Sequence, residues 1–232
     1  EVPCLSSDTP ISDPELADTA INEISAYASL ASKINAKYIR VLGDKTPAPT
    51  KEIDDTIVIN SLIRLIPIAT KYDVTLLVET NGVYSDTKRL KKVLEAVNDS
   101  HIAALWDIHH PYRNFGESPN ETVSNLGDYI KFIHVKDSSK VGDTVEYRLM
   151  GDGDMPLANI FECLNRMNYD GYVSLEWVYR WSHDLSDAGI VVPHFADYMA
   201  QYRNKQQSTL QTDDRGQGQY IWPKETLIDL TF

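Results

Sequence analysis

Cysteine, basic charge and long apolar runs are all scarce in this sequence of 232 residues. Its two cysteines, Cys4 and Cys163, lie far apart, which argues against a disulfide framework or a thiolate zinc cluster and predicts reduced thiols. The sequence has 22 basic and 34 acidic residues. The resulting net charge of −12 repels phosphate backbones and anionic membranes. No run approaches the roughly 18 apolar residues of a membrane span, and no signal-peptide pattern is present. We therefore expect no nucleic-acid or membrane partner and a cytoplasmic location.

Several motifs that would indicate other enzyme classes are also missing. The sequence has no Walker loop, no Gly-x-Ser-x-Gly elbow and no Cys-His pair, so acyl and phosphoryl transfer lack support. A doubly wound sheet would need a glycine-rich phosphate turn after an early strand. The nearest match is Gly151-x-Gly153, and no strongly apolar strand precedes it.

Short apolar runs alternate along the chain with amphipathic helical segments. The predicted strands are 2–5, 38–43, 74–79, 102–107, 129–136 and 172–177, with a further extended segment near 145–150. The predicted helices are 12–34, 53–71, 87–98, 119–126, 157–167 and 193–203, with Pro67 as a kink in the second. This alternation predicts an α/β fold with a parallel sheet. Functional residues at the strand ends favour a TIM (β/α)8-type barrel over a doubly wound sheet.

The strand count bears on the domain organisation. A closed barrel needs eight strands and six are predicted, so the chain is expected to lack the first one or two βα units. We assign 1–203 to the barrel and 204–219, which is polar and aperiodic, to a linker. Residues 220–232 turn apolar again, either as the start of a further module or as an arm that docks on the barrel.

Four of the apolar runs end in a residue that can bind a metal ion. These residues are Glu79, Asp107, His134 and Glu176. Because active sites of α/β barrels lie where the strands end, we expect the four side chains to converge. Oxygen ligands with one imidazole suit Mn²⁺, Mg²⁺, Co²⁺ or Zn²⁺.

Other polar and aromatic residues lie close to these strand ends in the sequence. We expect His110 to contact substrate and His109 to be structural, while Lys136 or Asp137 pairs locally and holds its loop. Lys140 could reach a substrate oxygen or remain a solvated lysine. The predicted substrate contacts are completed by Arg40, which could also pair with a ligating carboxylate, and by Trp177, whose ring could form an apolar wall.

Six short pieces of the sequence, taken together, resemble the xylose isomerase-like barrel superfamily. This superfamily includes sugar isomerases and epimerases, inosose dehydratases and endonuclease IV of the AP endonuclease family 2 type. The pieces are Tyr38-Ile39-Arg40-Val41, Val78-Glu79-Thr80-Asn81, Trp106-Asp107-Ile108-His109-His110, His134-Val135-Lys136-Asp137, Gly151-Asp152-Gly153-Asp154 and Ser174-Leu175-Glu176. Their order across residues 38–177 is more specific than any one of them.

The ketose 3-epimerase branch implies roles for individual residues. The resemblance makes Glu79, Asp107, His134 and Glu176 the metal ligands, with Glu79 and Glu176 as the acid–base pair. It also makes His110, three residues after the metal aspartate, a substrate contact. Two positions depart from relatives. Asn81 stands where many have histidine, and Lys140 stands where some have arginine, whose planar two-pronged contact lysine cannot make.

The resemblance implies an enzyme of carbohydrate metabolism, a metal-dependent isomerase or epimerase that acts on a sugar, ketose or cyclitol through an enediolate. Two alternatives remain. One is an inosose-type dehydratase, and the other is a non-catalytic sugar- or metal-binding barrel within a larger protein. The expected partner is a small sugar or polyol, and a homo-oligomer or a fused domain is a further expectation.

Overall fold

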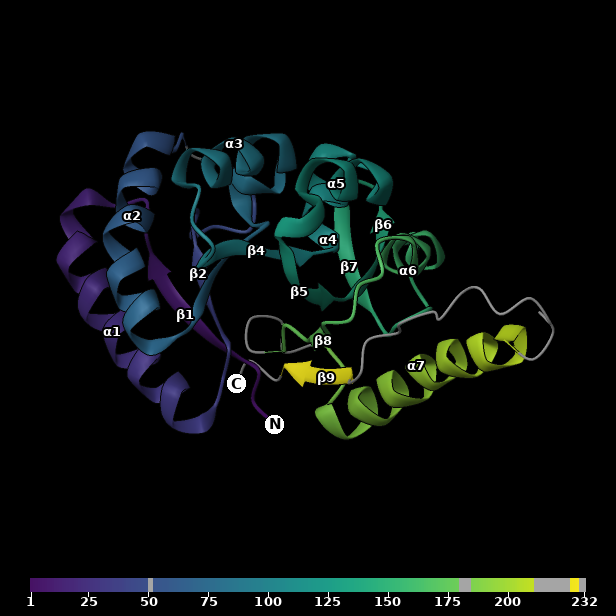
Figure 1. The fold of residues 1–232 in the computed structure, drawn as a ribbon. Helices are drawn as coiled ribbons and strands as arrows, with labels where there is room; N and C mark the ends of the chain where they lie inside the picture. Colours follow the sequence, from purple (N-terminus) through teal and green to yellow (C-terminus); the bar gives the residue numbers. More distant parts are fainter. Residues whose placement is uncertain (50–51, 180–184, 211–225, 230–232) are drawn as a thin grey trace. The chain divides into compact units, whose positions relative to one another are not determined.

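The computed structural model describes residues 1–49, 52–179, 185–210 and 226–229, with side chains described only as far as residue 200. The chain divides into two compact units, Glu1–Phe132 and Ile133–Phe232. Hydrogen bonding orders seven strands as β1-β2-β3-β4-β5-β8-β9, and β6 pairs separately with β7. Strands and helices alternate along the chain (Figure 1). None of the helices in the described part of the chain is long and apolar enough to cross a membrane.

The first unit contains four parallel strands with helices between them. The strands are β1 (Cys4–Pro10), β2 (Tyr38–Leu42), β3 (Thr75–Glu79) and β4 (Ile102–Asp107), paired in sequence order. The helices are α1 (Ala17–Ile34), α2 (Asp55–Tyr72), α3 (Thr87–Val97), α4 (His109–Phe115) and α5 (Pro119–Leu126), and three short 3₁₀ turns are η1 (Pro14–Leu16), η2 (Gly82–Ser85) and η3 (Gly127–Tyr129). Every residue of β4 is buried, as expected for a parallel strand covered on both faces.

Local signals in the sequence explain where these helices begin and end. Asp54 and Asp86 cap α2 and α3 by accepting backbone N–H groups of the first turn. At the start of α5, Ser118 and Glu121 form a reciprocal capping box. Asn98 closes α3 in the left-handed conformation, which asparagine tolerates better than most residues. These caps fix where α2, α3 and α5 begin and where α3 ends.

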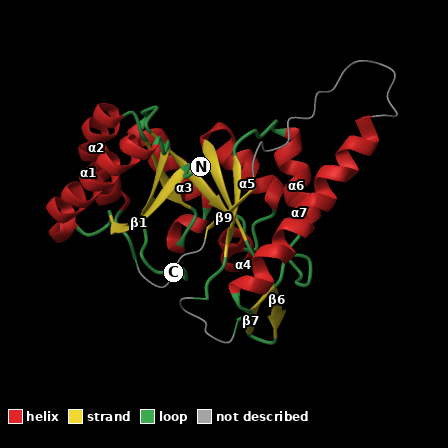
Figure 2. Cartoon of the chain, turned by 90° about the horizontal axis from the view of Figure 1, so that it is seen from below, coloured by secondary structure: helices red, strands yellow, loops and turns green. Residues whose placement is uncertain are grey.

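The second unit combines the last three residues of a strand that begins in the first unit, a hairpin, two helices and a pair of parallel strands. Its elements are β5 (Ile130–Val135), β6 (Asp137–Val141), β7 (Thr144–Arg148), α6 (Leu157–Arg166), β8 (Tyr172–Glu176), α7 (Ala188–Leu210) and β9 (Thr226–Asp229). β6 and β7 form an antiparallel hairpin, which Figure 2 shows as a separate two-stranded ribbon. β8 and β9 are parallel, and their register places Glu176 opposite Asp229.

The structure confirms the predicted α/β class and the six predicted strands, and it differs from the prediction at three places. The expected loop after Asp107 is the helix α4, and the polar segment after Lys136 is the strand β6. The last helix ends at Leu210 rather than near 203, so it extends over the first seven residues of the segment that was predicted as the linker 204–219. Residues 211–219 lie outside the described residues, as does most of 220–232.

The hydrogen bonds that join Tyr84, Asp55 and Arg89 lead to a prediction about the stability of the first unit. Tyr84 is buried, its hydroxyl donates to Asp55 Oδ1 at 2.9 Å, and Arg89 Nε contacts the same carboxylate. Removing the hydroxyl in Tyr84→Phe should lower the free energy of unfolding by about 1 kcal/mol at pH 7, measured by urea denaturation.

The stability that Tyr84 contributes should depend on pH, and this dependence provides a second test of the prediction. Burial, and then the hydrogen bond to Asp55, raises the pKa of the Tyr84 phenol, so the folded protein keeps the phenol neutral where the unfolded chain ionises it. The contribution of Tyr84 is therefore present below about pH 10 and is lost at higher pH. The deficit of Tyr84→Phe should shrink at pH 11, and a deficit that grows there would contradict this assignment.

Candidate metal centre

Two of the predicted ligands lie at the ends of neighbouring strands in the first unit. Glu79 is the last residue of β3 and Asp107 the last of β4, and both are buried. The strand register pairs Glu79 with Leu105, so Asp107 lies two residues further on, on the same face of the sheet. The Thr80 hydroxyl donates to the Asp107 carbonyl at 3.1 Å and accepts from the Asp107 N–H at 2.9 Å. This reciprocal pair fixes the two strand ends against each other.

Glu79 is held by a buried arginine from the adjacent strand. Arg40 Nη1 donates to Glu79 Oε2 at 3.0 Å, and Arg40 Nη2 donates to Asp8 Oδ1 at 2.9 Å. A buried carboxylate is costly unless its charge is compensated, and this guanidinium provides part of the compensation. The sequence predicted Arg40 as a substrate contact or as the partner of a ligating carboxylate, and the structure shows the pair with Glu79.

The helix α4 brings two histidines beside Asp107. Asp107 Oδ1 accepts the backbone N–H of His109 at 2.8 Å and that of His110 at 3.4 Å, which anchors the first turn of α4 to the strand end. His110 Nε2 lies 3.6 Å from Asp107 Oδ2, and the two imidazole rings meet edge to face at 5.4 Å. Both histidines are buried. His110 therefore lies against the carboxylate that the sequence marks as a ligand.

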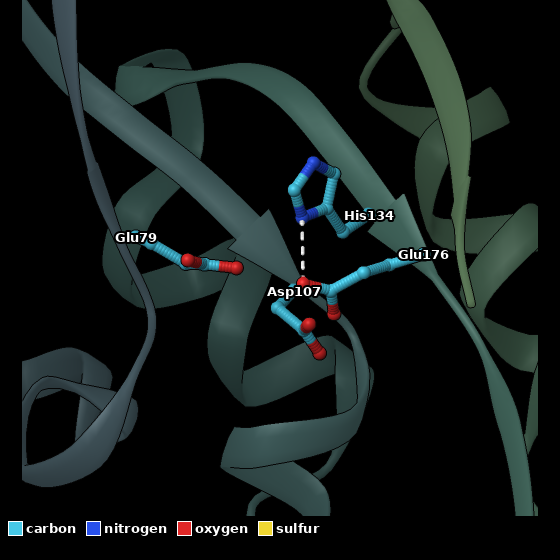
Figure 3. Close-up of side chains that lie close together, drawn as sticks. All are labelled: Glu79, Asp107, His134 and Glu176. Atoms are coloured by element: carbon cyan, nitrogen blue, oxygen red, sulfur yellow. Dashed lines mark ion pairs between the residues drawn. The ribbon is translucent and has the colours of Figure 1, made fainter. Parts of the chain in front are cut away.

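The second unit contributes the other two predicted ligands. His134 lies near the end of β5 and Glu176 is the last residue of β8, and both are buried. His134 Nδ1 lies 3.8 Å from Glu176 Oε1, the contact drawn as a dashed line in Figure 3. Lys136, itself buried, forms an ion pair with Glu176 Oε2. Sequence reasoning placed Lys136 in a local pair, because a contact across 40 residues leaves no signal in a single sequence.

These four residues form a group of potential metal ligands, which Figure 3 shows. Each offers one ligand atom, and the four atoms lie within 4.8 Å of one another. Ligands on opposite sides of a divalent ion with bonds of about 2.1 Å are about 4 Å apart, so the donors have the spacing that a small ion requires. Three carboxylates and one imidazole are also the donor types that Mg²⁺, Mn²⁺ and Zn²⁺ accept. The residues present therefore fit a divalent cation.

The segment after Lys136 is organised by Asp137. Its carboxylate accepts the backbone N–H groups of Ser138 at 2.8 Å, Gly151 at 2.9 Å, Gly153 at 3.0 Å and Met155 at 3.3 Å. The predicted role of Asp137, to hold its own loop, agrees with these contacts. They tie the beginning of β6 to the Gly151–Gly153 turn, so that this turn has a structural function.

The remaining predicted substrate contacts have different environments. Trp177 follows Glu176, is buried, and donates its indole N–H to the Ser186 carbonyl at 2.9 Å. It borders a hollow of about 520 Å³ that is also lined by β7 residues such as Arg148. Lys140 is exposed on β6. Asn81, which departs from the pattern of relatives, is buried and donates to the Asp44 carbonyl at 2.8 Å, so it holds the loop after β2.

A family model described as xylose isomerase-like TIM barrel matches residues 3–196. The chain belongs to this family. The fold is accordingly a partial barrel of the xylose isomerase-like type. No curated protein sequence matches the chain.

Solved structures show the same fold at low sequence identity. An L-ribulose 3-epimerase is 14% identical with a TM-score of 0.71, covering 92% of this chain and 78% of its own. The probable 3-DHS dehydratase AsbF from Bacillus anthracis is 17% identical with a TM-score of 0.64, covering 76% and 70%. The IolI protein with a bound zinc atom is 16% identical with a TM-score of 0.63, covering 75% and 66%. The chain thus spans between 66% and 78% of the length of these proteins, and the likeness shows the fold.

Proposed function

We propose that this protein is a divalent-metal-dependent isomerase or epimerase that acts on a sugar, ketose or cyclitol. The observation that carries the proposal is the buried group of three carboxylates and one imidazole, whose ligand atoms lie within 4.8 Å of one another. Membership of the xylose isomerase-like family and the likeness to an L-ribulose 3-epimerase support the same class of reaction.

The ligands that we assign to the ion are Glu79, Asp107, His134 and Glu176. Mn²⁺, Mg²⁺, Co²⁺ and Zn²⁺ all accept these donor types. When bound, the ion would supply a Lewis acid, which polarises the substrate carbonyl and makes the proton on the neighbouring carbon more acidic.

We assign the proton transfers to the two glutamates. One removes the proton from the carbon next to the carbonyl, and the other returns a proton to the opposite face or to the neighbouring carbon. Arg40 contacts Glu79 and Lys136 contacts Glu176, so each carboxylate has a fixed cationic neighbour. In this arrangement Glu79 and Glu176 would stand on opposite sides of the substrate carbon.

Three further residues are proposed to contact substrate. His110 lies beside Asp107 and can exchange hydrogen bonds with a substrate hydroxyl. Trp177 can offer an apolar ring face, the usual wall of a sugar site. Lys140 is exposed and carries a mobile ammonium that could reach a substrate oxygen.

A dehydratase that acts through the same first proton abstraction is the second candidate. The observation that favours it is the structural likeness to a probable 3-DHS dehydratase. The two reactions separate after the enediolate, because a dehydratase expels a neighbouring hydroxyl as water. A product 18 mass units lighter than its substrate would therefore identify the dehydratase.

Solvent deuterium exchange tests the proposal directly. With added Mn²⁺ in D₂O, we expect one carbon-bound proton next to the carbonyl to be replaced by deuterium in at least one member of a panel of ketoses, ketose phosphates and inososes. Chelation should abolish this exchange, and proton NMR with mass spectrometry would measure it. Mn²⁺ binding without exchange or product across the panel would instead favour a non-catalytic binding barrel.

A further inference from the structure

Arg40 connects three neighbouring strands at the metal centre. It lies on β2, opposite Ser6 of β1 and Leu77 of β3 in the strand register. Residues two apart on a strand share a face, so Glu79, two residues after Leu77, lies on the face of Arg40. Asp8 lies where the register of β1 against β2 shifts, between Ser6 and Pro10, and it is placed at Arg40 by their direct contact. The guanidinium uses Nη1 for Glu79 Oε2 at 3.0 Å and Nη2 for Asp8 Oδ1 at 2.9 Å.

The two carboxylates at this guanidinium have different surroundings. The Glu79 side chain is 3% exposed and the Asp8 side chain 63%, while that of Arg40 is 8% exposed. Arg40 Nη2 also donates to the Ser7 carbonyl at 3.4 Å, which ties the group to the backbone of β1. Because a guanidinium is planar and its donors point in fixed directions, contacts with β1 also fix the direction of the donor that meets Glu79.

We propose that Arg40 is a positioning residue, which holds Glu79 by Oε2 and so directs Oε1 toward the ion and the substrate. Asp8 accepts from the other terminal nitrogen of the same guanidinium and so holds it from the exposed side. This inference rests on the proposed function for its effect on catalysis, while the Arg40–Glu79 contact itself is independent of the reaction. It develops the second of the two roles predicted for Arg40, the pairing with a ligating carboxylate.

A double-mutant cycle separates positioning from ordinary stabilisation. The variants are Arg40→Met, Glu79→Gln and the double variant, because a residue that acts through Glu79 has no further effect once Glu79 is changed. The matched control is Arg64→Met, which removes an arginine whose ion pair with Asp18, at 2.8 Å, is exposed. Each variant is assayed for deuterium exchange, per equivalent of bound Mn²⁺, and for the melting temperature of the metal-free protein.

We expect Arg40→Met to reduce the maximal exchange rate by about 10- to 100-fold, the usual effect of losing a partner that orients a metal ligand. The KM should change by less than about threefold, since Arg40 does not itself bind substrate in this proposal. The double variant should match Glu79→Gln within about twofold. In the metal-free protein Arg40→Met should lower the melting temperature by about 6–12 °C, with a smaller loss when Glu79 is also changed. Arg64→Met should leave both measurements near the wild type.

Two results would overturn the positioning role. One is wild-type exchange per bound Mn²⁺ in Arg40→Met, and the other is a double variant that loses the full Arg40→Met factor below Glu79→Gln. If Arg40→Met does not fold, Arg40→Lys keeps the charge without the planar fork and should still lose exchange about tenfold. Absence of exchange in the wild type would refute the proposed function, while the melting-temperature cycle would still report whether Arg40 and Glu79 are coupled.

Discussion

Glutamine in place of Glu176 is expected to reduce the deuterium exchange rate by at least about 1,000-fold. The substitution preserves the size of the side chain but removes its negative charge, so the proposed enzyme loses a proton-transfer group and a metal ligand together. Lys136 would then face a neutral amide in a buried site and would lose the negative charge of its Glu176 partner, which adds a further penalty. Exchange should be measured by proton NMR at saturating Mn²⁺, and Mn²⁺ affinity by calorimetry on the same samples.

Glu146→Gln provides the matched control for this experiment. Glu146 lies in the same unit and also forms an ion pair with a basic residue, Arg148, but its side chain is 48% exposed. Its loss should leave exchange within about twofold of the wild type, since an exposed ion pair contributes little. Exchange retained within tenfold in Glu176→Gln would remove Glu176 from the acid–base pair.

The position of the candidate metal centre follows from features that a single sequence displays. Buried parallel strands appear as short aliphatic runs, and the residue that ends such a run lies at the edge of the sheet. This reasoning placed the ends of β3, β4 and β8, where Glu79, Asp107 and Glu176 lie. The roles of these residues in binding and catalysis stay predictions, because the fold fixes where side chains lie and not which reaction they perform.

The elements that the prediction missed depend on contacts rather than on composition. His109-His110-Pro111 has weak helix propensity, and α4 forms because the Asp107 carboxylate accepts its first N–H groups and Gly116 closes it in the left-handed conformation. Asp137-Ser138-Ser139 has no apolar alternation, and β6 exists through pairing with β7. A cap formed by a proposed metal ligand and a hairpin with polar strands both lie outside simple periodicity rules.

Long-range ionic partners show the same limit. The sequence indicated that Arg40 could pair with a ligating carboxylate, since it is a lone charge in an apolar strand, but it did not identify Glu79 as the partner. The pair of Lys136 with Glu176 had no comparable signal, because a lysine two residues after a strand-end histidine is equally consistent with a solvated loop. The first contact joins two neighbouring strands, and the second joins the residue between β5 and β6 to the end of β8, so both depend on the folded arrangement of the chain rather than on local sequence.

Alanine in place of Asp137 is expected to lower the free energy of unfolding of the protein by about 3–5 kcal/mol. Asp137 is 1% exposed and its carboxylate accepts four backbone N–H groups, from Ser138, Gly151, Gly153 and Met155. Each buried donor left without an acceptor costs about 1–3 kcal/mol, and partial access of water to the loop reduces the total. Equilibrium urea unfolding, followed by circular dichroism, would measure the change.

Asp137→Asn and Asp143→Ala separate the acceptor role from other effects of the change. Asparagine keeps the volume and one acceptor oxygen, so about 2 kcal/mol should be lost if the hydrogen bonds matter most. Asp143 lies in the exposed turn of the same hairpin, and its loss should cost less than about 0.5 kcal/mol. Equal stability of Asp137→Ala and the wild type would show that the four contacts do not support the loop that follows β5.

The Gly151–Gly153 turn requires glycine for the Asp137 carboxylate to approach, because a Cβ on Gly153 would lie 2.1 Å from Asp137 Oδ1.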